Sequence, residues 1–182
     1  PTLDDITTRD NIRGVGRMNA LAFHPTDPDI VFAGAPAGGL WRSYDGGANW
    51  ETNTDDFPTL GVSAIAFAPT DPTVVYIGTG DRDASDSPGM GVMKSFDGGL
   101  TWEFANSGIS GYVVGDLAVH PANGNQVVAS TSNGIFKTTD GGETWYQVSN
   151  NTQNYKDIAV HPTNPDIIYC TGQGRFWRSE DA

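Results

Sequence analysis

The sequence predicts an all-β fold, and three observations support this class. Gly, Ser, Thr, Asn and Asp are abundant while charged residues make up only 18% of the 182 residues, a composition typical of short strands and turns. Apolar residues stand in short runs without helical spacing, as in the stretch 30–33. The same order of runs and turns returns along the chain about every 42 residues.

The repeat is visible in four aligned segments. They read NALAFHPTDPDIVFAGA, SAIAFAPTDPTVVYIGT, GDLAVHPANGNQVVAST and KDIAVHPTNPDIIYCTG, and begin at Asn19, Ser63, Gly115 and Lys156. Their shared prolines are 44, 52 and 41 residues apart, at Pro25, Pro69, Pro121 and Pro162. The wider second interval indicates an insertion in the second unit.

Each unit predicts four short strands. In the first unit we expect them at 21–23, 30–33, 40–43 and from 49 onward. The stretch 24–28 predicts the first turn, because proline fixes φ and aspartate accepts hydrogen bonds from turn backbone. Asp45-Gly46-Gly47 predicts the turn into the fourth strand, since glycine tolerates positive φ.

Pairs of apolar neighbours in the third strand distinguish between β architectures. They stand at Leu40-Trp41, Val92-Met93, Ile135-Phe136 and Phe176-Trp177. A two-sheet sandwich predicts strict alternation of apolar and polar residues instead. A sheet covered on both faces accommodates such pairs, as in the blades of a propeller. The sequence therefore favours a β-propeller of four-stranded blades.

The repeats predict three full blades and most of a fourth within residues 18–182. The expected boundaries are 18–60, 61–110, 111–153 and 154–182, the last without its closing turn and fourth strand. Residues 1–17 form an N-terminal segment, which we expect to complete a blade elsewhere. We expect a partial ring whose further blades belong to the same polypeptide, because each blade needs a neighbour on both faces.

Composition excludes several kinds of partner. The formal net charge is −12 and no Lys/Arg cluster is present, which argues against nucleic acid because phosphate binding needs a basic surface. No apolar run reaches the length of a membrane span. The single Cys170 allows no intrachain disulfide, and we expect it to be a small buried side chain.

One motif recurs in three units as SYDGGANW, SFDGGLTW and TTDGGETW, and SED at 179–181 begins a fourth copy. It resembles the Asp-box, or BNR, repeat of sialidases, xyloglucanases and sortilin-type receptors. A catalytic site needs one unique constellation, whereas this set serves every blade, so we expect it to fasten the turn. The predicted structural residues are Ser43, Asp45, Gly46, Trp50, Ser95, Asp97, Gly98, Trp102, Thr138, Asp140, Gly141 and Trp145.

A second resemblance concerns location. The segments GRMNALAFHPTDPDIVFAGAPAGGLWRSYDGG and YIGTGDRDASDSPGMGVMKSFDGGLTW are similar to N-terminal propellers of large secreted or cell-surface proteins of Bacteroidetes-type bacteria. In that group, adhesion domains and a sorting signal for type IX secretion often follow. The resemblance implies an extracellular protein.

The insertion, GTGDRDASDSPGMG at 78–91, is the candidate functional loop, because long loops on a rigid scaffold often carry binding. It holds Asp81, Asp83 and Asp86. Carboxylates are hard oxygen ligands and could bind Ca²⁺, although the spacing differs from an EF-hand. The alternative is a solvated acidic loop.

Two further residue types recur once per blade. His24, His120 and His161 are expected to bond turn backbone, since equivalent positions around a ring do not converge on one metal. Arg42, Lys94, Lys137 and Arg178 are expected to form salt bridges with neighbouring blades. The alternative for these cations is a basic ring that faces a ligand.

The resemblance to xyloglucanases makes Pro36 informative. Their catalytic Asp lies in a T-D-x-G-G stretch of the first blade, and the matching stretch here is APAGG at 35–39. Proline cannot transfer a proton, and no catalytic residue is predicted in the chain. The sequence therefore favours a non-catalytic binding or adhesion module for a glycan or a protein. The alternatives are part of a glycoside hydrolase with its carboxylates in other blades, and a peptide-binding propeller of the sortilin or assembly-factor type.

Overall fold

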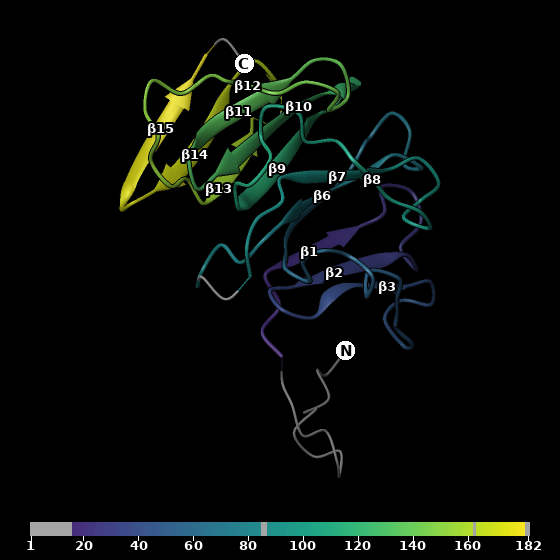
Figure 1. Cartoon of the computed structure of the whole chain (residues 1–182). Helices are drawn as coiled ribbons and strands as arrows, with labels where there is room; N and C mark the ends of the chain where they lie inside the picture. The colour runs from purple at the N-terminus through teal and green to yellow at the C-terminus, as the bar shows by residue number, and fades with distance from the viewer. Residues whose placement is uncertain (1–15, 85–86, 162, 181–182) are drawn as a thin grey trace.

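The computed structural model describes residues 16–84, 87–161 and 163–180. Within these ranges the chain forms fifteen β-strands and no helix, arranged in four antiparallel sheets. Figure 1 shows the sheets following one another along an arc, from the purple N-terminal sheet to the yellow C-terminal one. The predicted all-β class and the propeller-like partial ring are confirmed. The described residues contain no helix long and apolar enough to cross a membrane.

Each sheet is one blade, and its strands lie side by side in chain order. Blade 1 contains β1 (Ala20–Phe23), β2 (Val31–Ala35), β3 (Gly39–Ser43) and β4 (Glu51–Thr52). Blade 2 contains β5 (Val62–Phe67), β6 (Val75–Thr79), β7 (Val92–Ser95) and β8 (Glu103–Phe104). Blade 3 contains β9 (Val114–His120), β10 (Asn123–Thr131), β11 (Gly134–Thr138) and β12 (Tyr146–Gln147). Blade 4 contains β13 (Asp157–Val160), β14 (Ile168–Gly172) and β15 (Arg175–Ser179).

The first strand of every blade lies nearest the axis of the arc. β5 packs against β1 and β9, and β13 packs against β9, so these strands meet along the axis. The two-residue strands β4, β8 and β12 lie at the opposite, outer edge of their sheets. The loops between the second and third strands, including the insertion of blade 2, therefore open at the end of the axis where the inner strands begin.

The hydrophobic core is divided among the three interfaces between successive blades. Phe32 and Leu40 of blade 1 pack with Met93 of blade 2. Tyr76 and Val92 of blade 2 pack with Phe136 of blade 3 in the second cluster. Val128 and Ile135 of blade 3 pack with Ile158 and Trp177 of blade 4 in the third. In blades 2 and 3 both neighbours of the apolar pair are thus used, one on each face, whereas Trp41 of blade 1 and Phe176 of blade 4 are exposed.

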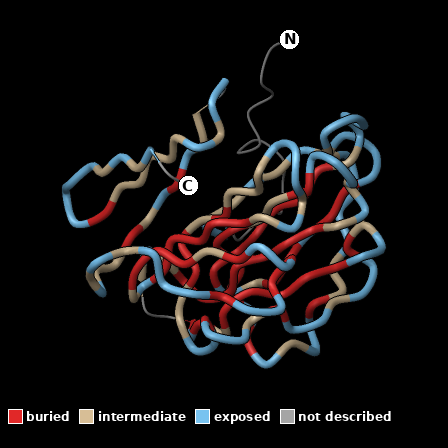
Figure 2. The backbone as a smooth tube through the Cα atoms, turned by 90° about the horizontal axis from the view of Figure 1, so that it is seen from above, coloured by how far each residue is buried: buried red, intermediate tan, exposed pale blue. Residues whose placement is uncertain are grey.

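Burial falls off at both ends of the arc. Leu21 and Phe23 on β1 are 61% and 63% exposed, whereas Phe67 at the position of Phe23 in blade 2 is buried. Figure 2 shows buried residues through the middle of the sheets, and the strands β14 and β15 carry mainly intermediate and exposed residues. The outward faces of blades 1 and 4 therefore carry apolar residues of the kind that is buried between blades. Among the described residues no further blade covers them.

The fourth strand of blade 1 begins directly after Asn49-Trp50, near which the sequence predicts it. β4 starts at Glu51 rather than Asn49, because the N–H of Asn49 donates to Asp45 Oδ1 at 2.8 Å and belongs to the turn. The fourth sheet has three strands. The segment 1–17, which we expect to complete a blade elsewhere, lies almost entirely outside the described residues.

Candidate functional site

The three Asp-boxes, at residues 43–50, 95–102 and 138–145 (boxes 1, 2 and 3), close with the same hydrogen bonds. In box 3, Thr138 Oγ1 donates to Asp140 Oδ1 at 2.7 Å and accepts from the N–H of Gly142 at 3.0 Å. Asp140 Oδ1 also accepts from the N–H of Thr144 at 3.0 Å. Both glycines of each box have positive φ, between 70° and 96°. The motif is thus a local clasp that any blade can carry.

These bonds stabilise the ionised carboxylates. The pKa of Asp45 is lowered to about 2, mainly by the N–H of Asn49. The pKa of Asp97 is also lowered to about 2, mainly by the hydroxyl of Thr101. The hydroxyl of Thr138 is the largest cause of the low pKa of Asp140. A group held ionised in this way is unsuited to donate a proton near neutral pH.

The box tryptophans differ in what they cover. Trp145 is 5% exposed, and its Nε1 donates to the carbonyl oxygen of Ala105 in blade 2 at 2.7 Å. Trp50 is 39% exposed and donates instead to Gly47 O of its own turn at 2.9 Å. Trp102 packs against the core cluster that contains Phe32. Boxes 2 and 3 therefore insert against the preceding blade, and box 1 has no such blade among the described residues.

The recurrent cations cross the same interfaces. Arg42 donates to the carbonyl oxygen of Gly99 in box 2, and Lys94 Nζ donates to Gly141 O in box 3 at 2.9 Å. Their acceptors in the next blade are backbone carbonyls, not the carboxylates that the sequence led us to expect. Arg178 pairs with Glu180 on its own blade.

The acidic insertion is held by protein groups. The buried carboxylate of Asp81 accepts from Arg17, from Asn19 Nδ2 at 3.1 Å and from the N–H of Asp83 at 3.1 Å. Burial raises its pKa, but these hydrogen bonds outweigh it and the pKa is lowered. Asp83 is half-exposed, and Asp86 lies outside the described residues. The described part of the chain holds no group of three or more metal-ligating side chains, and a calcium site at this loop stays a prediction.

An axial pocket of about 190 Å³ lies beside this loop, where blades 2, 3 and 4 meet. Arg82 Nη1 crosses it to reach Gly115 O at 3.1 Å and Asp157 Oδ1 at 3.2 Å. Lys156 Nζ lies 3.9 Å from Asp83 Oδ1. The lining residues are Asp81, Arg82, Asp83, Ala84, Val113, Gly115, Ser132, Asn154 and Lys156. The pocket offers charged and neutral hydrogen-bonding groups on a rigid base of inner strands.

Asp116 is a half-buried carboxylate that the sequence analysis missed. It accepts from the N–H groups of Leu117 at 2.9 Å and Ile158 at 3.0 Å, which joins the inner strands of blades 3 and 4. Burial raises its pKa. The signal was available, since blades 1 and 2 have Ala20 and Ala64 at this position. Its bonds mark it as a residue that ties two blades together.

The histidines and Pro36 lie apart from this pocket. Nδ1 of His24, His120 and His161 accepts backbone N–H groups within its own turn, at 3.1 to 3.4 Å. Pro36 is buried in the turn between β2 and β3.

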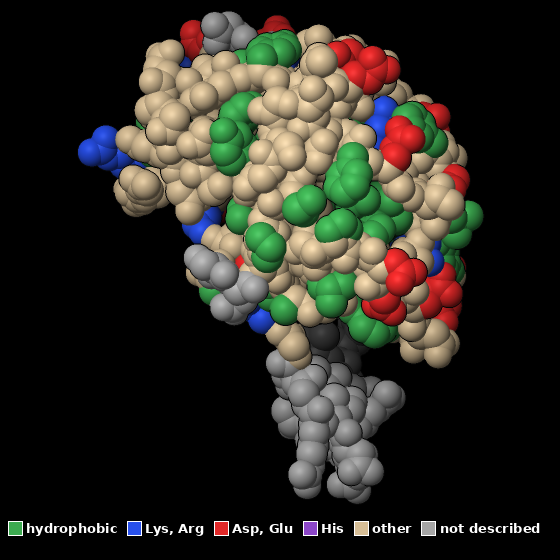
Figure 3. All heavy atoms as spheres, in the orientation of Figure 1, with side chains coloured by type: hydrophobic (Ala, Val, Ile, Leu, Met, Phe, Trp, Pro, Cys, Tyr) green, Lys and Arg blue, Asp and Glu red, His purple; other side chains and the backbone are tan. Residues whose placement is uncertain are grey.

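Figure 3 shows acidic side chains mainly along the right-hand rim and the top of one face of the molecule. The negative charge therefore does not gather into one patch on the face shown.

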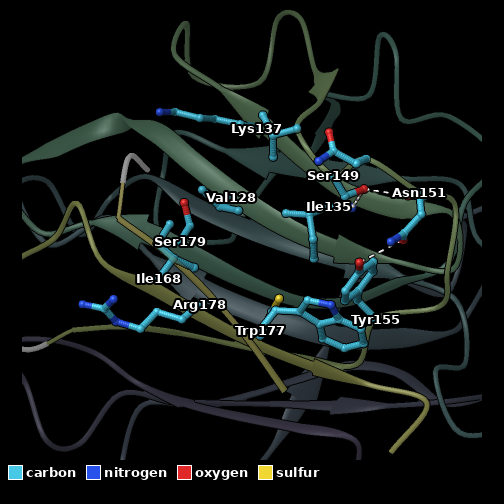
Figure 4. A pocket seen from close by; sticks show the side chains of 13 residues that line it. Val128, Ile135, Lys137, Ser149, Asn151, Tyr155, Ile168, Trp177, Arg178 and Ser179 are labelled. Carbon is cyan, nitrogen blue, oxygen red and sulfur yellow. Dashed lines mark hydrogen bonds between the residues drawn. The ribbon is translucent and has the colours of Figure 1, made fainter. Parts of the chain in front are cut away.

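A larger cavity than the axial pocket, the interface pocket of about 590 Å³, lies between blades 3 and 4. Figure 4 shows Val128, Ile135 and Lys137 on one side and Trp177 and Arg178 on the other, with the bond from Tyr155 to Asn151 at one end. Tyr155 donates this bond to Asn151 Oδ1 at 2.9 Å. The lining of the interface pocket combines apolar residues such as Val128 and Ile168 with polar ones such as Lys137.

Comparison with known proteins places the chain among propellers. Residues 90–182, half of the chain, match the family model Sortilin-Vps10, described as sortilin, neurotensin receptor 3. The xyloglucanase of Hypocrea jecorina is 31% identical over 185 residues, which cover 93% of this chain and 22% of that protein. Xyloglucanase Xgh74A of Acetivibrio thermocellus is 33% identical over 172 residues, which cover 86% of this chain and 20% of that protein. The chain therefore spans about a fifth of the length of these curated relatives.

Solved structures agree on the fold. An ancestral GH74 enzyme matches with a TM-score of 0.71 and 23% identity, over 85% of this chain and 22% of that one. The GH74 xyloglucanase of Xanthomonas campestris matches with a TM-score of 0.67 and 23% identity, over 92% and 29%. YCF48 bound to D1 peptide matches with a TM-score of 0.61 and 13% identity, over 90% and 53%. At these identities the likeness shows the propeller fold alone.

The xyloglucanase relatives contradict the expected non-catalytic binding or adhesion module. That expectation rested on Pro36, which stands where the resemblance places an acid. The error has a physical reason, because a propeller brings side chains from several blades to one axis. The absence of an acid at position 36 of blade 1 therefore does not make the whole ring non-catalytic.

Proposed function

The chain belongs to the Sortilin-Vps10 family, and we propose, from its xyloglucanase relatives, that it is part of a glycoside hydrolase of the xyloglucanase type. The supporting observation is its similarity to two xyloglucanases over most of its length, at identities above 30%. The proposed reaction is hydrolysis of a glycosidic bond in a β-glucan backbone. Because such a polymer lies outside cells, we also propose an extracellular location.

Glycoside hydrolysis sets the chemical requirement. In most such enzymes two carboxyl groups flank the scissile bond, one as an acid and one as a base or nucleophile. Pro36 cannot serve as either. Asp81 is bonded to Arg17 and Asn19, and Asp116 to two backbone N–H groups. Asp83 and Asp157, the exposed carboxylates at the axial pocket, are paired with Arg82 and Lys156, and we therefore propose that the catalytic carboxylates lie in other blades of the polypeptide.

The axial pocket supports a substrate-contacting role for these blades. Sugar hydroxyl groups both donate and accept hydrogen bonds, and the pocket combines the half-exposed Asp83 with Lys156 and Asn154. Its inner-strand base, tied by Arg82 to blade 4, holds these groups in place. Preorganised polar groups of this kind orient a substrate without a conformational change.

The polypeptide that contains this chain tests the proposal on xyloglucan, with release of reducing ends as the measurement. We expect hydrolysis, and a several-fold higher KM with little change in kcat for Asp83→Asn combined with Lys156→Met, since these groups would bind substrate and transition state alike. Asp166→Asn, an exposed change in the turn between β13 and β14, is the matched control. A folded polypeptide that cleaves no β-glucan would contradict the proposal.

A further inference from the structure

Two ring side chains that recur in the repeat are replaced where blades 2 and 3 meet. Blade 2 has Ala68 at the first position of the turn between its first two strands, where the other blades have histidine. Blade 3 has Gly124 at the fifth position of the same turn, where the other blades have proline. The two changes lie against each other, because a Cβ added to Gly124 would be 3.1 Å from Cβ of Ala68. One interface therefore lacks both an imidazole and a pyrrolidine ring.

The other two interfaces show what the imidazole does. The His24 ring packs edge-on against Phe67 of blade 2, with the ring centroids 5.4 Å apart. Its Nδ1 accepts from the N–H of Asp27 at 3.1 Å. Between blades 3 and 4, His120 and Pro165 line a cavity of only about 10 Å³. The imidazole thus fills space between two blades and accepts turn N–H groups.

Between blades 2 and 3 the corresponding place is a pocket of about 260 Å³, which we call the turn pocket. Ala68 and Val74 contribute apolar surface to its lining, and Thr70, Asp71 and Asn125 contribute polar groups. Ala68 is buried, whereas the three polar residues are exposed, so an apolar base lies under a polar rim. Pockets for drug-sized ligands hold roughly 300–1,000 Å³, and this smaller one suits a single ring.

The turn pocket lies at the other end of the ring axis from the axial pocket. The axial pocket is lined by Val113 and Gly115, at the start of β9. The turn pocket is lined by Ala122 and Asn123, which follow the end of β9 at His120. A ligand in the turn pocket therefore leaves the axial pocket free, and this inference does not rest on the proposed hydrolysis.

Replacement of the histidine leaves a backbone donor unused. The N–H groups of Thr26 and Thr163 donate to the imidazole of their own turns, at 3.4 and 3.3 Å. Thr70 stands at the same position in blade 2, and within the described ranges its N–H and its hydroxyl have no hydrogen-bond partner. The same holds for the side-chain amide of Asn125. Together with the carboxylate of Asp71, these groups offer both donors and acceptors to a ligand.

We propose that the turn pocket binds one neutral pyranose ring. A sugar oxygen accepts from the N–H of Thr70 in place of the imidazole, and sugar hydroxyl groups bond Asp71 and Asn125. The C–H face of the ring covers Ala68 and Val74. A neutral ligand fits better than an anion, since the described lining has a carboxylate and no lysine or arginine to balance a further negative charge.

Saturation-transfer NMR on the polypeptide that contains this chain tests the proposal, with methyl β-D-glucopyranoside as the probe. Thr70→Val keeps the shape of the side chain and removes its hydroxyl, and is expected to weaken binding roughly two- to tenfold. Thr26→Val is the matched control, because it makes the same change in a turn that keeps its histidine. We expect the control to bind the probe as the unmodified polypeptide does.

A second variant, Ala68→His, restores the imidazole. It is expected to abolish the binding that Thr70→Val weakens, without a lower melting temperature. Xyloglucan oligosaccharides as a second probe distinguish the source of the ring, since tighter binding than the methyl glucoside assigns the pocket to a chain and equal binding assigns it to a free sugar. Both results support the proposal.

Two results overturn the proposal. One is equal binding of the probe by the unmodified polypeptide, Thr70→Val and Ala68→His, and the other is an equal loss in Thr26→Val and Thr70→Val. Release of reducing ends from xyloglucan should be unchanged in all three variants, because the turn pocket lies away from the axial pocket. A polypeptide that binds the probe in the turn pocket and cleaves no β-glucan would therefore contradict the proposed function alone.

Discussion

The second and third blade interfaces are built from the same repeat positions and differ in what lies between the sheets. Between blades 2 and 3, box 3 brings a buried tryptophan and a glycine carbonyl that Lys94 binds. Between blades 3 and 4, the matching residues line a cavity of about 590 Å³. An Asp-box therefore has two roles. Its side-chain hydrogen bonds close its own turn, which we call the clasp, and its tryptophan and glycines fill the space against the preceding blade, which we call the wedge. Four predictions test this division.

The largest effect is expected from removal of the wedge. Trp145→Ala deletes a buried ring and its bond to Ala105, and should lower the free energy of unfolding by about 3–5 kcal/mol. Trp50→Ala, in a box that covers no other blade, should cost under about 1 kcal/mol. Urea denaturation of both variants is the measurement. Equal losses would show that the tryptophan acts only within its own turn.

Lys94 should contribute more to stability than Lys137. Lys94→Met leaves the carbonyl oxygen of Gly141 without its charged donor at a buried interface, and should cost about 2–3 kcal/mol. Lys137→Met, at the unfilled interface of this chain, should change stability by less than about 0.5 kcal/mol. Urea denaturation midpoints of the two variants are the measurement. A loss of stability for Lys137→Met as large as that for Lys94→Met would contradict the proposed difference between the interfaces.

A smaller loss of stability is expected when the residue of blade 2 that contacts box 3 is enlarged. Ala105→Val adds two methyl groups beneath box 3, where Gly142 already lies close, and should cost about 1–3 kcal/mol by overpacking. The reverse change at the equivalent position, Val148→Ala, removes a half-exposed side chain and should cost under about 0.5 kcal/mol. The melting temperatures of the two variants show whether stability depends on this position at the second interface and not at the third.

The smallest loss of stability is expected from the box aspartates, whose hydrogen bonds lie within one turn and do not depend on a neighbouring blade. The folded pKa of Asp45 and Asp97 is about 2 against an ordinary 3.8. Stability from these groups is therefore present above about pH 4 and lost as pH falls toward 2. Asp97→Asn and Asp45→Asn should each lower the melting temperature above pH 4, with the difference shrinking toward pH 2. A pH profile that differs between the two variants would contradict a clasp that is independent of the interface.

Features with short-range causes were predictable from the sequence. The proline turns and the box motif act within eight residues or fewer, so repetition of Asp45-Gly46-Gly47 was enough to indicate the propeller. The bond from Asn49 to Asp45, which delays the fourth strand, is equally local but depends on turn geometry that spacing does not reveal.

Features that join blades were less predictable. Arg42 and Gly99 are 57 residues apart, and recurrence of the cation indicated a contact with the next blade but not a carbonyl acceptor. The half-buried Asp116 differs from the alanines at this position in blades 1 and 2, but its role could not be read from that difference because its partner, Ile158, lies on another blade. The function was misjudged for a related reason, since Pro36 reports on one blade and catalysis on a ring draws on several.

The most direct test of the wedge role is the loss of unfolding free energy on Trp145→Ala, measured beside the loss on Trp50→Ala. We predict a loss at least roughly 2 kcal/mol larger for Trp145→Ala, because its buried ring and its bond to Ala105 lie between blades 2 and 3. Equal losses would contradict this account.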